Sequence, residues 1–110
     1  MPNRYNVYLD DIIASIEKIQ QYTAGCSYET FASNTLVVDA VIRNLEIIGE
    51  AVKKLSPEMK KKHPEIEWKN IAGLRDILIH EYSGVNLRII WDVVVHKLPS
   101  LKDAVREIRQ

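Results

Sequence analysis

The sequence has few of the features that mark several large classes of protein. Its one cysteine, Cys26, cannot form an intrachain disulfide and has no companion ligands at zinc-site spacing, and neither His63 nor His96 has a second ligand four residues later on the same helix. The 15 basic and 15 acidic residues cancel, so the chain lacks the overall positive charge of a general nucleic-acid binder. We therefore expect no metal and no cofactor, a reducing environment, and only local contacts with any nucleic acid.

Long apolar runs are also missing. No stretch approaches the roughly 20 apolar residues of a membrane span, and the first residues, MPNRYNVYLDD, carry acids where a secretion signal would be apolar. We expect a soluble, cytoplasmic protein without a membrane segment. At 110 residues the chain should form a single domain over 1–110, with no internal repeat.

Glycine and proline are scarce, with four of each, and the chain between them has helical periodicity. Apolar residues recur every three or four positions from about Tyr5 to Tyr22, and Gly25 is a candidate C-terminal cap. A loop or short turn should then lead to a second long helix, which Ser33 or Asn34 can cap.

The second half of the chain predicts further helices. Ser56 and Pro57 have the order of an N-cap followed by a proline in the first turn, which indicates a short helix. A third long helix is expected from about Trp68 to His80. After a turn, Asn86 can cap a fourth helix, which Pro99 should interrupt.

The segments LVV and IIWDVVV are rich in β-branched residues and raise the alternative of strands. Their apolar and polar residues alternate poorly, and turn signals do not recur at strand spacing. The sequence therefore predicts an all-α fold, an up-and-down four-helix bundle with one or two additional short helices.

Asn44 is an unusual residue for its position on the second long helix. On a helical wheel it lies in the middle of the apolar face, where an unsatisfied amide costs about 1 to 3 kcal/mol. It is either a core asparagine that fixes helix register or part of a polar site where helices or subunits meet. Gly49, near the edge of that face, indicates that a neighbouring backbone comes close. Glu46 and Glu50 lie on the opposite face, where we expect solvent around them, the alternative being contact with a partner subunit or antitoxin.

The segment LRDILIHEY, which begins at residue 74, places polar side chains in an apolar helix. If the helix continues through Tyr82, Arg75 shares a face with Tyr82, whereas His80 lies well around the helix. A buried guanidinium needs an acid, a phosphate or water, and Asp76 and Glu81 are the nearest acids. These features alone favour a structural role, because such an arginine commonly snorkels and such a histidine commonly caps or packs.

RDILIHEY also has a distinctive order: arginine, polar residue, three residues, histidine, any residue, tyrosine. In this order it resembles the signature of HEPN-domain proteins of the HepT-like toxin family. The likeness extends to AVIRNLEIIGEAVKKL and IIWDVVVHKLPSLK and so covers nearly the whole chain. The resemblance implies a HEPN-like helical bundle that forms a homodimer or a higher oligomer.

The resemblance also implies an activity: metal-independent cleavage of RNA by an endonuclease that is the toxin of a type VII-like toxin–antitoxin pair. The family's catalytic residues fall on Arg75 and His80, with Asp76 adjoining, and we add Asn44 as a second supporting residue. RNA carries its own nucleophile, the 2′-hydroxyl, so cleavage requires a group that moves protons and a cation. Histidine suits the first task and arginine the second.

One histidine cannot readily act as base and acid on opposite sides of a phosphate. A two-fold dimer would present two copies of Arg75 and His80 to one cleft, so we expect activity to depend on dimerisation. By the resemblance, Tyr82 corresponds to the residue that a partner antitoxin, a minimal nucleotidyltransferase of the MntA type, modifies with AMP. An adenylate there would block RNA and compete for the cation. The alternative for Tyr82 is a packed core aromatic.

A run of lysines supplies local positive charge. These side chains are candidate RNA contacts, although such a run is more often a solvated surface: Lys53, Lys54, Lys60, Lys61 and Lys62. Two other functions stay open. One is a catalytically silent helical module that binds the nucleotidyltransferase, and the other is a plain helical dimer whose polar residues only specify its interface.

Overall fold

The computed structural model describes residues 4–109, except the side chain of Tyr82, and this part of the chain is built from helices without strands. Its long helical segments are α1 (Asn6–Thr23), α3 (Thr35–Lys53), α5 (Trp68–His80) and a run made of α6 (Leu87–Asp92), the π-helical segment η2 (Val93–Lys97) and α7 (Leu98–Ile108). Short helices lie between them: α2 (Tyr28–Ser33), α4 (Pro57–Lys62) and the 3-10 turn η1 (Tyr82–Gly84). The predicted all-α fold is confirmed.

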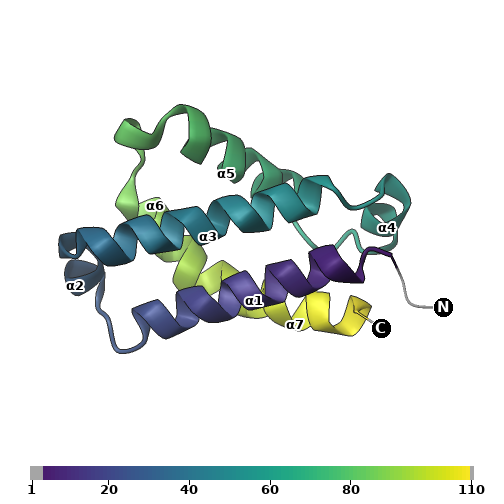
Figure 1. Cartoon of the computed structure of the whole chain (residues 1–110), viewed down its shortest axis with the longest axis horizontal. Coiled ribbons are helices and arrows are strands. Elements are labelled where there is room, and N and C mark those ends of the chain that lie inside the picture. Colours follow the sequence, from purple (N-terminus) through teal and green to yellow (C-terminus); the bar gives the residue numbers. More distant parts are fainter. Residues whose placement is uncertain (1–3, 110) are drawn as a thin grey trace.

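Helix α3 lies at the centre of the bundle. As Figure 1 shows, α1 runs along one side of it and α5 along the other, and α7 packs against α1. Buried apolar side chains from all of these helices belong to one core. Because α3 is packed against α1 on one side and α5 on the other, polar residues of α3 can contact a neighbouring helix instead of solvent. No helix in residues 4–109 combines the length and apolarity that crossing a membrane requires.

The starts of α3, α4 and α6 have the expected side-chain caps. Asn34 accepts a hydrogen bond from the backbone N–H of Val37 at the start of α3, over 3.2 Å. Ser56 and Asn86 cap α4 and α6 in the same way. Gly25 follows α1 with a φ of 76°, a left-handed conformation that favours glycine. These local signals therefore predict the bounds of the helices closely.

The connection between α1 and α3 is helical where a loop or short turn was expected. Ser27 and Thr30 form a reciprocal capping box, in which each side chain accepts from the backbone N–H of the other residue, and this starts α2. Phe31 anchors the short helix in the core, where it is fully buried and stacks on Trp91.

The assumption that the third long helix continues through Tyr82 is wrong. Helix α5 ends at His80, and the N–H of Glu81 donates to the carbonyl of Ile77 over 2.8 Å. The chain then turns through η1, where the N–H of Gly84 donates to the carbonyl of Glu81. Tyr82 is thus separated from the regular face of α5 that carries Arg75.

The expected interruption at Pro99 is also wrong. The chain stays helical because the turn before the proline widens: the N–H of Leu98 donates to the carbonyl of Val93, five residues back, in the π pattern of η2. Proline has no N–H, and its ring clashes with the carbonyl four residues earlier in a regular α-helix. The wider turn accommodates both the missing N–H and the proline ring, so α6, η2 and α7 form one continuous helical segment.

Candidate active site

Gly49 is the point at which α3 and α5 approach each other. A Cβ atom added at Gly49 would lie 2.2 Å from Cβ and 2.8 Å from Cγ of Arg75, and 3.3 Å from the carbonyl oxygen of Ile71. No larger residue fits there while α5 keeps its position. The prediction that a neighbouring backbone approaches Gly49 is confirmed, and the neighbour is the turn of α5 that carries Arg75.

The guanidinium of Arg75 is held by carboxylates from two helices. Its Nη1 donates to Oδ1 of Asp76 over 3.1 Å, and its Nη2 donates to Oε1 of Glu50 on α3 over 3.4 Å. Lys53, one turn further along α3, donates to the same oxygen of Asp76. The side chain of Arg75 is 24% exposed, and its Nε is buried without a hydrogen-bond partner. We call these four residues the Arg75 cluster.

Only one of the two acids that the sequence predicts beside Arg75 pairs with it, and another acid pairs with it as well. Asp76 is a partner, as the sequence indicated, whereas Glu81 follows α5 as an exposed cap residue. Glu50, for which solvent was expected, contacts Arg75 because α5 covers that side of α3. Glu46 pairs with Arg43 within α3, at 3.5 Å. The partner from the other helix could not be read from a motif confined to α5.

The Arg75 cluster favours the charged forms of Asp76 and Arg75. The hydrogen bonds from Lys53 and then from Arg75 lower the pKa of Asp76 below its ordinary range. The hydrogen bond to Asp76 in turn raises the pKa of Arg75 above its already high value. The cluster therefore combines two cations, Arg75 and Lys53, with two carboxylates and carries no net charge at neutral pH.

His80 lies at the carboxyl end of α5, where its side chain is exposed and no described residue bonds to it. Five residues separate it from Arg75, which places the two α-carbons about 7.5 Å apart along the helix axis. Ile77 and Ile79 beside it are 50% and 40% exposed, whereas Leu78 is buried. The end of α5 therefore presents the histidine within an uncovered apolar surface.

The two other residues that the sequence predicts in the site are Asn44 and Tyr82. Asn44 is 7% exposed, donates from Nδ2 to the carbonyl of Ala40 over 2.9 Å, and leaves Oδ1 buried without a partner. Its hydrogen bonds do not reach the Arg75 cluster, so the structure joins Asp76 to Arg75 but not Asn44. The side chain of Tyr82 lies outside the described residues.

The predicted lysine run divides between different surroundings. Lys53 belongs to the Arg75 cluster, and Nζ of Lys54 lies 5.6 Å from the ring centroid of Tyr8 on α1. Lys60, Lys61 and Lys62 lie on α4, at the opposite end of the bundle from the carboxyl end of α5 (Figure 1). These lysines do not form one patch, and their contact with RNA stays a prediction.

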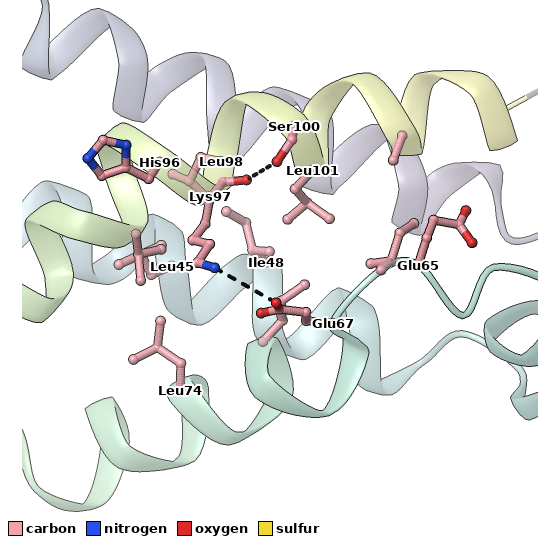
Figure 2. Close-up of a pocket in the computed structure, with 14 residues that line it drawn as sticks. Leu45, Ile48, Glu65, Glu67, Leu74, His96, Lys97, Leu98, Ser100 and Leu101 are labelled. Atoms are coloured by element: carbon pink, nitrogen blue, oxygen red, sulfur yellow. Dashed lines mark hydrogen bonds and ion pairs between the residues drawn. The ribbon is translucent and has the colours of Figure 1, made fainter.

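A separate pocket of about 330 Å³ lies between α3, α5 and the η2–α7 run. Figure 2 shows its apolar side chains, among them Leu45, Ile48 and Leu74, with an ion pair between Lys97 and Glu67 across it at 3.8 Å. Neither Arg75 nor His80 lines this pocket. The sequence did not predict it, because its lining comes from segments that are distant in the chain.

Comparison with known proteins identifies the family. The family model described as Ribonuclease HepT-like matches residues 12–108. "Putative RNase TTE0752" of Caldanaerobacter subterraneus subsp. tengcongensis is 47% identical over 103 residues, which cover 94% of this chain and 92% of that protein. "Probable ribonuclease HepT" of Thermococcus cleftensis is 42% identical over 110 residues, the full length of both chains. No solved structure matches.

Within residues 4–109 no three histidine, cysteine, aspartate or glutamate side chains are grouped as metal ligands. Arg75, Asp76 and His80 belong to the motif on which the resemblance was based, and the family match extends well beyond that motif on both sides. The chain belongs to the HepT-like ribonuclease family.

Proposed function

We propose that this protein is a metal-independent RNA endonuclease and the toxin of a toxin–antitoxin pair, with Arg75 and His80 as its catalytic residues. One observation carries the proposal: α5 presents an anchored guanidinium and an exposed imidazole five residues apart, in a chain of the HepT-like ribonuclease family. Relatives of this chain bear ribonuclease names.

The chemistry uses groups that the chain and the RNA already hold. The 2′-oxygen of a nucleotide attacks the adjacent phosphorus and loses its proton to a base, the bond from phosphorus to the 5′-oxygen breaks, and that oxygen takes up a proton. The products are a 2′,3′-cyclic phosphate and a 5′-hydroxyl. His80 moves the protons, and Arg75 stabilises the charge that develops on the phosphoryl oxygens.

A second copy of the chain completes this site. One imidazole serves one side of the phosphate, whereas an isologous dimer supplies a second His80 for the other side. The carboxyl end of α5, the start of α3 and α6 lie toward the same end of the bundle (Figure 1). Each of these segments carries exposed apolar residues: Ile77 and Ile79 in α5, Leu36 in α3 at 80% exposure and Ile89 in α6 at 58%. Burying them against a second copy brings two His80 side chains together.

Regulation acts through Tyr82, two residues after His80. A nucleotidyltransferase antitoxin of the MntA type transfers AMP to its hydroxyl. The bulky anionic group then stands beside the catalytic histidine, where it excludes RNA and repels phosphate.

The test compares the wild-type chain, expressed without an antitoxin, with Arg75→Ala and His80→Ala. Each substitution should abolish growth arrest and lower the RNA cleavage rate at least about 100-fold, as loss of general acid–base or charge-stabilising groups does. His96→Ala is the matched control, because His96 is also exposed and lies near an acid, Asp92 at 4.0 Å. Wild-type protein that cleaves no RNA, with variants that behave identically, would refute the proposal.

One observation favours a second function, a catalytically silent module that binds the nucleotidyltransferase. Arg75 already has two carboxylate partners, as a purely structural arginine would. In that case the purified chain binds the nucleotidyltransferase, and Arg75→Ala weakens the complex, while neither form cleaves RNA.

A further inference from the structure

Two consecutive residues of α3 constrain Arg75 at its two ends. At the base of the side chain, Cβ and Cγ of Arg75 occupy the space that a side chain at position 49 would need. At the tip, Nη2 donates to Oε1 of Glu50. Neither residue belongs to the motif on α5, yet together they decide where the guanidinium lies.

We propose that Gly49 and Glu50 are positioning residues for Arg75: Gly49 lets α5 approach α3 closely, and Glu50 orients the guanidinium toward the RNA phosphate. This inference rests on the proposed function, because it assumes that Arg75 acts on RNA.

The hydrogen bonds of Arg75 determine what remains for a ligand. A guanidinium has five N–H donors. Nε is buried, Nη1 gives one hydrogen to Asp76, and Nη2 gives one to Glu50. One hydrogen is left on each terminal nitrogen, and such hydrogens of an arginine can bind phosphate oxygens. Glu50 and Asp76 thus hold the guanidinium through both terminal nitrogens and leave a hydrogen on each for a phosphate.

Lys53 makes this arrangement compatible with an anionic substrate. Two carboxylates beside one arginine would repel a phosphate, but Lys53 pairs with Asp76 and brings the net charge of the Arg75 cluster to zero. The cluster therefore orients the arginine without making the site acidic.

The experiment measures kcat and KM of the full-length chain on a fluorogenic single-stranded oligoribonucleotide of mixed sequence, for Glu50→Ala and Glu50→Gln. Glu50→Ala should lower kcat about tenfold or more, as misplacement of a catalytic group does, and leave KM within about twofold. Glu50→Gln keeps an acceptor oxygen and should recover part of the lost kcat. The matched control is Glu17→Ala, which removes another half-exposed carboxylate that pairs with an arginine of a different helix, Arg106 at 2.8 Å.

Folding and assembly are checked by thermal melting and size-exclusion chromatography, since a positioning residue changes kcat in a protein that still folds and dimerises. Gly49→Ala, which tests the approach of the helices, should lower kcat whenever it folds. If Arg75→Ala abolishes cleavage while Glu50→Ala matches Glu17→Ala, the positioning role is overturned and the ribonuclease function stands. The positioning role is also overturned if Glu50→Ala and Glu50→Gln have the same effect and that effect is only a lower KM. In that case Glu50 repels the RNA through its charge and does not orient Arg75. Cleavage unaffected by Arg75→Ala removes the proposed function itself.

Discussion

Replacing Gly49 by alanine is the sharpest test of the contact that positions the site. Carbon atoms pack about 3.5 Å apart or more, and the new Cβ would lie 2.2 Å from Cβ of Arg75, so the helices must separate by about 1.3 Å. Both atoms are attached directly to backbone, so no side-chain rotation relieves the overlap. Overpacking of this kind costs about 1 to 3 kcal/mol, and we take the upper value.

Alanine also gains helix propensity over glycine, about 1 kcal/mol, which leaves a net loss of about 2 kcal/mol for Gly49→Ala. For 110 residues this lowers Tm by about 9 °C. Gly73→Ala on α5 is the matched control: its Cβ would meet nothing within 4 Å, so the same substitution should stabilise the chain by up to about 1 kcal/mol.

Urea denaturation measures the change in the free energy of unfolding for Gly49→Ala and for Gly73→Ala. The protein concentration is the same in all samples, so that any dimer contributes equally. The reasoning fails if Gly49→Ala is as stable as Gly73→Ala, because α5 would then not approach α3 as described.

Three further predictions concern charge, assembly and regulation. Lys53 and Arg75 lower the pKa of Asp76 in the folded chain. The ionised Asp76 therefore stabilises the fold fully at any pH above its pKa in the unfolded chain. This stabilisation is lost as pH falls through the lower pKa of the folded chain. Asp76→Asn should therefore be less stable than wild type at neutral pH, and this difference in the free energy of unfolding should shrink as pH falls below the unfolded pKa. Urea denaturation measures the difference, and one that stays constant with pH would contradict this. Ile77→Lys should give a folded monomer that cleaves no RNA, by size-exclusion chromatography and a cleavage assay, whereas the control Val7→Lys, at another exposed apolar position, should stay dimeric. Co-expression with an MntA-type nucleotidyltransferase should add AMP to the intact mass of wild type but not of Tyr82→Phe.

The helices of this chain are encoded locally, and so they could be predicted. The bounds of α5 agree with the apolar periodicity, and the starts of α3, α4 and α6 follow from single capping residues that bond to a backbone N–H nearby. Gly49 also gave a local signal, because a glycine within a long helix needs a reason for its low propensity.

The contact between Glu50 and Arg75 could not be predicted in the same way. A helical wheel of α3 with one apolar face places Glu50 in solvent. Val38, Ile42 and Leu45 lie outside that face, yet they are buried. Together they form a second apolar stripe, which is the pattern of a central helix that is packed on two sides.

The division of the site between two helices has a consequence for the family motif. Helix α5 carries the groups that we propose to be reactive, but Gly49 and Glu50 of α3 constrain where the guanidinium lies. Under the proposed function, a relative that keeps the arginine and histidine but has a bulky residue in place of Gly49 would retain the reactive groups and lose their geometry. We therefore expect intact motif residues to be insufficient for activity by themselves, and the residues that face Arg75 from α3 belong to any assessment of whether such a chain cleaves RNA.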